Sequence, residues 1–106
     1  MRELPHPPAD TIRLAQVLHA LSDEARLEIV ARLAESDETC APLGDGIELH
    51  KSTLSHHYRV LREAGLTHTT VVGRTRLIRL RRDDLDELFP GLLDAVLHNL
   101  AARPVR

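Results

Sequence analysis

Serine, histidine and arginine side chains gather in one short segment, KSTLSHHYRVLREAGL, at residues 51–66. If residues 51–64 form a helix with Leu54 facing the core, a rotation of about 100° per residue turns one polar set outward. This set consists of Ser52, His56, Arg59 and Glu63, with Ser55 and Arg62 along one edge. Hydroxyl, imidazole and guanidinium groups hydrogen-bond to phosphate oxygens and to base edges in the major groove. The segment therefore predicts a helix that reads DNA, and the alternative is an ordinary solvated helix face.

His57 lies at a different angle on the same helix, beside Val60 and Ala64. Two roles are open to it, a packed and hydrogen-bonded histidine or a further DNA contact. Catalysis is not predicted, because no Asp or Glu partner and no Gly-rich nucleophile turn accompany the serines and histidines. We therefore expect no enzyme.

Charge is distributed unevenly along the chain. The 106 residues carry a formal net charge of −2, but residues 51–82 hold eight basic side chains and a single acid, a local charge of +7. Such segregation suits a polyanionic partner, while the acidic flanks limit indiscriminate binding. The alternative is a module whose basic face binds a protein or RNA partner. A protein-docking face would show exposed leucine or aromatic anchors, and the outward set has none.

The helices that position this segment are predicted from apolar periodicity and from capping residues. One is expected at about 10–20 with Asp10 as its cap, a second at 23–34, and the third at 51–64. Gly65 should end the third helix in a left-handed conformation. Low aromatic content, 2% of residues, also favours a helical core.

The period changes after the third helix. β-Branched residues predict a hairpin over 67–80 with its turn at Gly73–Arg74. Acidic residues then begin a helical region over 83–101, with a break near Phe89 because Pro90 follows it. The expected fold class is mainly α with a β-hairpin.

Length and composition limit the organisation of the chain. Residues 1–8 contain three prolines and are predicted to form a flexible arm, and 9–106 can build one domain but not a second core. Residues 35–50 are expected to be irregular. No apolar run approaches the roughly 20 residues that span a bilayer, and no signal peptide core is present, so no membrane partner and a cytoplasmic location are expected.

Three segments together resemble the ArsR/SmtB family of bacterial winged helix-turn-helix repressors: LSDEARLEIVARL, STLSHHYRVLREAGL and VVGRTRLIRL. The resemblance covers residues from about 12 to 100. It implies a homodimer on an inverted-repeat, double-stranded DNA operator, with the helix at 51–64 in the major groove and the hairpin as the wing. The DNA-binding residues predicted from the helix and the wing are Lys51, Ser52, Thr53, Ser55, His56, His57, Arg59, Arg62, Arg74 and Arg76.

The dimer is expected to form through the N-terminal and C-terminal helices. The apolar C-terminal helix offers more surface than a small monomer covers easily, which favours pairing with a second copy. The predicted interface residues are Ile12, Leu14, Leu18, Leu92, Leu93, Val96, Leu97 and Leu100.

The metal sites that many relatives use do not fit this sequence. Their thiolate site needs paired cysteines, but Cys40 is the single cysteine. Their other site needs carboxylate and histidine ligands on the C-terminal helices, where this chain aligns Arg82, Asp84, Ala95 and His98. Arginine and alanine do not ligate a divalent cation in this way, so we expect neither a metal nor another cofactor. The effector is not indicated by the sequence.

Overall fold

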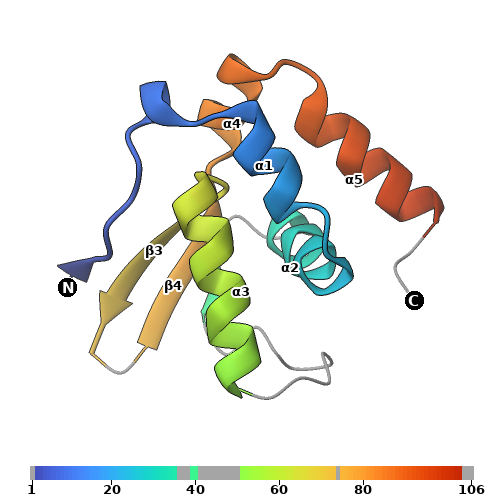
Figure 1. The fold of residues 1–106 in the computed structure, drawn as a ribbon. Coiled ribbons are helices and arrows are strands. Elements are labelled where there is room, and N and C mark those ends of the chain that lie inside the picture. The colour runs from blue at the N-terminus through green and yellow to red at the C-terminus, as the bar shows by residue number, and fades with distance from the viewer. Residues whose placement is uncertain (1, 36–38, 41–50, 74, 104–106) are drawn as a thin grey trace.

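Five α-helices form the body of the protein in the computed structural model, which describes residues 2–35, 39–40, 51–73 and 75–103 (Figure 1). The helices are α1 (Leu14–Ala20), α2 (Glu24–Glu35), α3 (Lys51–Ala64), α4 (Arg82–Leu88) and α5 (Leu92–Ala102). The second and third helices lie close to their predicted bounds. The predicted break near Phe89 is confirmed, because α4 ends there and Gly91, with φ +82°, precedes α5.

The first predicted helix, 10–20, differs from the structure. A single 3-10 turn, η1 (Ala9–Thr11), is followed by extended backbone at Ile12 and Arg13 before α1 begins. Asp10 makes no capping hydrogen bond. The extended backbone carries the side chain of Ile12 into the core, where it lies so close to Gly65 that a Cβ on the glycine would be 2.5 Å from it. Tertiary packing therefore overrides local helix propensity here.

A small antiparallel sheet lies beside α3 (Figure 1). The predicted hairpin is confirmed as β3 (Thr67–Val72) and β4 (Thr75–Leu80), in the register Thr69 opposite Ile78. Two short strands extend it, β1 (Arg2–Glu3) on the β3 edge and β2 (Thr39–Cys40) on the β4 edge. The segment predicted to be a flexible arm, 1–8, lies against the hairpin at residues 2–6, because Arg2 and Glu3 pair with β3 and His6 accepts a hydrogen bond from Thr69.

The core lies between the helices and the inner face of the hairpin. Its most deeply buried large side chains come from three helices, the turn after α3 and the sheet: Ile29, Leu33, Leu61, Leu66, Ile78 and Leu85. Burial of this apolar surface is the main force that fixes α3 against the rest of the body. The described helices include none with the length and apolarity required to cross a bilayer. Residues 41–50, and with them most of the segment expected to be irregular, lie outside the described residues.

Candidate nucleic-acid interface

One face of α3 anchors the helix and the opposite face is open to solvent. Leu54 and Leu61 are buried, as their spacing predicts, whereas Ser55, His56 and Arg59 are exposed. At the C-terminal end Gly65, with φ +92°, lets the Leu66 amide donate to the Leu61 carbonyl at 3.0 Å. This αL ending satisfies a terminal carbonyl and turns the chain directly into β3. The helix is thus held at a fixed angle to the hairpin.

The exposed face presents an organised pair of side chains. The Arg59 guanidinium lies 3.2 Å from Nδ1 of His56, and because a guanidinium only donates, this ring nitrogen accepts. In the neutral ring the proton then sits on Nε2, which points a hydrogen-bond donor away from Arg59. Donors of this kind fit phosphate oxygens and the guanine acceptors of the major groove.

Arg62 joins this face to the wing. It is half-buried, and burial, together with the nearby positive charges of Arg76 and Arg59, lowers its pKa despite the opposing effect of Glu63. Its Nε is buried and has no hydrogen-bond partner among the described residues. Arg76 is exposed on β4. Three guanidinium groups from α3 and the hairpin therefore share one region, and their mutual repulsion favours an anionic partner.

His57 points into the protein, which is the packed alternative of the two roles considered for it. Only 8% of its surface is exposed, and its Nδ1 lies 3.1 Å from the Arg26 guanidinium and 3.9 Å from Asp23. Burial lowers its pKa, Arg26 and His56 add to the effect, and Asp23 opposes it. A neutral ring that accepts from Arg26 is the consistent state, so the expectation of a DNA contact for His57 is not supported by this position.

Arg26 is a residue that supports the position of α3 and that the sequence analysis missed. Its side chain is buried in α2, donates from Nε to the Ala20 carbonyl at 2.7 Å, and donates from the other end to His57. It therefore ties the turn between α1 and α2 to α3. Its spacing from Val30 and Leu33, i+4 and i+7, was the available signal, because it places an arginine on the apolar face of its helix.

The other predicted contacts are placed less completely. Thr53 is half-buried on α3. The side chains of Lys51 and Ser52, and the whole of Arg74, lie outside the described part of the structure. Like the contacts predicted for the exposed face of α3 and for the wing, these four contacts with DNA remain predictions.

The predicted dimer residues fall into two groups. Leu14 and Leu18 on α1 are 45% and 47% exposed, although they are large and apolar. Leu92, Val96, Leu97 and Leu100 are half-buried. Ile12 and Leu93 are different, because they lie in the core of the chain itself with 8% and 2% exposure. Assigning these two residues to an interface is therefore not supported, since their surface is already covered.

Two of the four aligned metal positions, Arg82 and Asp84, make ion pairs within the chain. Arg82 lies 3.3 Å from Asp94, and Asp84 accepts a hydrogen bond from Arg81 at 3.0 Å. Within the described ranges no three His, Cys, Asp or Glu side chains come together as a metal site would require. The residues present at these positions do not fit a divalent cation.

Comparison with known proteins places the chain in a family. A family profile described as a helix-turn-helix domain matches residues 21–70. The chain is 42% identical over 89 residues to the HTH-type transcriptional regulator YceK of Bacillus subtilis, covering 82% of this chain and 88% of that protein. It is 32% identical over 93 residues to the HTH-type transcriptional repressor SmtB of Mycobacterium tuberculosis, covering 87% and 67%. The chain belongs to the ArsR/SmtB family of helix-turn-helix transcriptional regulators.

Solved structures agree with this membership of the ArsR/SmtB family. An ArsR-like transcriptional regulator from Rhodococcus sp. RHA1 superimposes with a TM-score of 0.60 at 28% identity, over 84% of this chain and 79% of that one. A possible transcriptional regulator for arsenical resistance gives a TM-score of 0.62 at 29% identity, over 89% and 100%. The fold is a winged helix-turn-helix, with α3 as the second helix of the motif and β3–β4 as the wing.

Proposed function

We propose that this ArsR/SmtB regulator is a homodimeric repressor that binds an inverted-repeat DNA operator through α3 and the wing, without the metal sites common in its relatives. The observation that carries the proposal is the exposed Ser55–His56–Arg59 face. It continues through Arg62 to Arg76 on the wing. A polar helix face beside a cationic hairpin suits simultaneous contact with base edges and the phosphate backbone.

Two exposed leucines on α1 support the dimer. Leu14 and Leu18 are one helical turn apart and form an apolar strip that a second copy could cover by symmetry. Two α3 helices related by a twofold axis would then meet major grooves about one DNA turn apart, so an inverted repeat is the matching operator. The relative SmtB is named a repressor, which supports that direction of regulation.

Two substitutions distinguish the role of the exposed α3 face from that of the wing. Their effects on DNA binding are measured by fluorescence anisotropy. His56→Ala removes a predicted base contact, so it should weaken operator binding by roughly 10-fold while leaving binding to random DNA nearly unchanged. Arg76→Ala removes a predicted phosphate contact. It should weaken binding to both duplexes alike and reduce the salt slope by about one.

Matched controls for these substitutions are available on α5. His98 is an exposed helical histidine and Arg103 is an exposed arginine just beyond the helix. Their alanine variants should bind like the wild type, provided sedimentation shows the same assembly. Equal losses from His56→Ala on operator and random DNA would contradict the base-reading role of α3.

A further inference from the structure

The N-terminal arm completes the outer edge of the wing. The Leu4 amide donates to the Thr69 carbonyl at 3.1 Å, and the Thr69 amide donates to Nε2 of His6 at 2.8 Å. Both backbone groups that Thr69 turns away from β4 are therefore satisfied by the arm. In a regular added strand, a backbone carbonyl of the arm would accept the hydrogen bond from the Thr69 amide. Here the side chain of His6 accepts it instead, because the arm turns away after β1.

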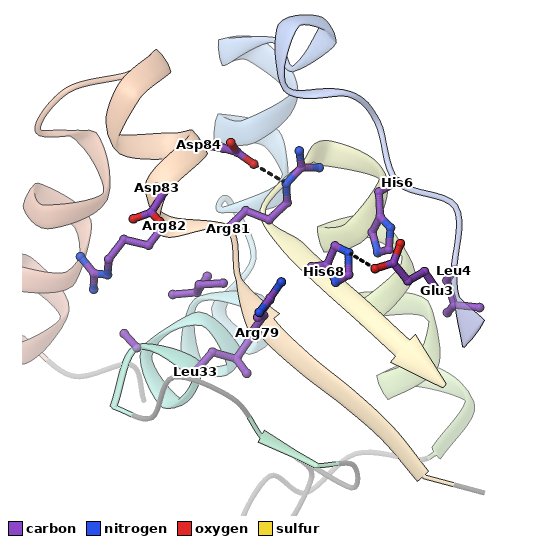
Figure 2. A pocket seen from close by; sticks show the side chains of 12 residues that line it. Glu3, Leu4, His6, Leu33, His68, Arg79, Arg81, Arg82, Asp83 and Asp84 are labelled. Atoms are coloured by element: carbon purple, nitrogen blue, oxygen red, sulfur yellow. Dashed lines mark hydrogen bonds and ion pairs between the residues drawn. The ribbon is translucent and has the colours of Figure 1, made fainter. Parts of the chain in front are cut away.

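A second set of contacts holds the same histidine. The rings of His6 and His68 stack with centroids 4.0 Å apart and planes within 8°. Nε2 of His68 lies 3.4 Å from the Glu3 carboxylate, and Arg81 donates to the Pro7 carbonyl at 2.8 Å. Figure 2 shows the stacked rings beside Glu3, with Arg81 reaching the carboxylate of Asp84. The arm is thus attached through His6 at its centre and through neighbouring residues on both sides.

This attachment requires a neutral His6. Nε2 accepts a hydrogen bond, so a proton on that nitrogen would point at the Thr69 amide hydrogen. Burial lowers the pKa of His6, three neighbouring basic groups lower it further, and only Glu3 opposes them. The basic groups are His68 on β3, Arg81 before α4 and Arg62 on α3. The adjoining hollow is lined by further charges of both signs, Arg79, Arg82, Asp83 and Asp84.

The docked arm also changes the surface of the wing. Arg2 is paired with Val71, and Val71 is paired with Arg76 on the next strand. Residues directly opposite one another in a sheet project from the same face, so Arg2 and Arg76 lie on one face, two strand spacings or about 10 Å apart. Arg2 is exposed. It extends the basic row of the wing by one cation.

We propose that residues 2–8 are a detachable arm, which adds the short strand β1 to the wing, which is held only while His6 is neutral and which presents Arg2 to DNA phosphate. The attachment stands on the contacts above, whereas the contact of Arg2 with DNA rests on the proposed function. The lowered pKa of His6 fixes the direction of the switch. The strand is fully docked above the ordinary histidine value of 6.5 and is released as the pH falls below it.

Amide hydrogen exchange at Thr69 tests the attachment without DNA. The protection factor, which removes the intrinsic effect of pH on exchange, should fall by up to about ten-fold between about pH 7.5 and about pH 5.5, the limit for one histidine with an ordinary pKa in the released arm. His6→Gln offers an oxygen near the position of Nε2 and does not titrate, so it should keep the protection at both values. His6→Ala should lose it at both. The buried Leu61 amide, in α3, is the internal reference for an intact fold.

Either of two results would overturn the attachment. Thr69 protection that is independent of pH in the wild type would show that His6 does not control docking. Full protection of the Thr69 amide in His6→Ala would show that the hydrogen bond to His6 does not control docking either. A parallel loss of protection at Leu61 would mean that the whole protein unfolds and not that the arm alone is released. His6→Gln preserves the acceptor, so its Thr69 protection then decides between release of the arm and general unfolding.

DNA binding at about pH 7.5 tests the role of Arg2. Arg2→Ala should reduce the slope of log affinity against log salt by about one, and Arg103→Ala should leave it unchanged. A wild-type slope for Arg2→Ala on DNA that the wild type binds tightly would overturn this role. Failure of the wild type to bind DNA at all would instead overturn the proposed function, while the Thr69 result would still decide the attachment.

Discussion

Replacing Arg26 by methionine removes the link between α2 and α3 with little change in side-chain length. The substitution leaves two buried acceptors without a donor, the Ala20 carbonyl and Nδ1 of His57, which lie 2.7 and 3.1 Å from the guanidinium. An acceptor stranded in this way costs about 1–3 kcal/mol. The hydrogen bond from the Arg26 backbone amide to Asp23 persists, since it does not involve the side chain. We therefore expect a loss of about 3 kcal/mol in the free energy of unfolding, reduced somewhat by easier burial of an uncharged side chain.

Urea unfolding followed by far-ultraviolet circular dichroism measures this loss. All variants must be compared at one protein concentration, because unfolding of the proposed dimer would depend on concentration. Arg32→Met on the same helix is the matched control. Arg32 is half-exposed and pairs with Glu28 at 3.2 Å, so its loss should cost no more than about 0.5 kcal/mol. A loss below about 0.5 kcal/mol for Arg26→Met would refute the role of Arg26 in fixing α3.

The remaining predictions concern pH, backbone conformation and assembly. His57→Asn keeps an acceptor near Nδ1 without titrating. Because the pKa of His57 is lowered in the native state, the neutral histidine stabilises the fold above about pH 6.5, and this stabilisation is lost as the pH falls. The free energy of unfolding of the variant, measured with urea, should therefore decrease less at acidic pH than that of the wild type. An unchanged dependence on pH would contradict this. Gly65→Ala should lower the free energy of unfolding by about 3 kcal/mol, because the cost of a positive φ adds to that of the clash with Ile12. Gly73→Ala, which also has a positive φ but open space around it, should lower it by about 1 kcal/mol. Equal shifts in melting temperature for the two variants would argue against the clash. Leu18→Glu should give monomers in sedimentation while Gln16→Glu, which lies on the opposite side of α1, should not; intact dimers of Leu18→Glu would move the interface elsewhere.

The helices and the hairpin could be predicted because their signals are local. The apolar spacing of Leu54 and Leu61 placed the inner face of α3, and its complement gave the exposed Ser55, His56 and Arg59. Gly65 ends α3 as its position predicted. Periodicity and capping depend on residues within a few positions of one another, so one sequence is enough to detect them.

The features that sequence reasoning missed depend on distant residues. The arm docks because His6 meets Thr69, which lies 63 residues further along the chain. His57 turns inward toward Arg26, which is 31 residues away. The first helix starts late because Ile12 packs against Gly65. No local pattern identifies these partners, although the helical wheel had already left a packed role open for His57, and at Ile12 the tertiary contact prevails over helix propensity.

Binding of the purified protein to DNA upstream of its own gene is the most direct test of operator recognition. Fluorescence anisotropy should be measured on this DNA and on a scrambled duplex, across a salt series, with and without a chelator. We predict clear preference for the upstream DNA, a steep salt dependence and no effect of the chelator. Equal weak binding to both duplexes would contradict sequence-specific recognition at this site, and loss of binding on chelation would contradict a metal-independent regulator.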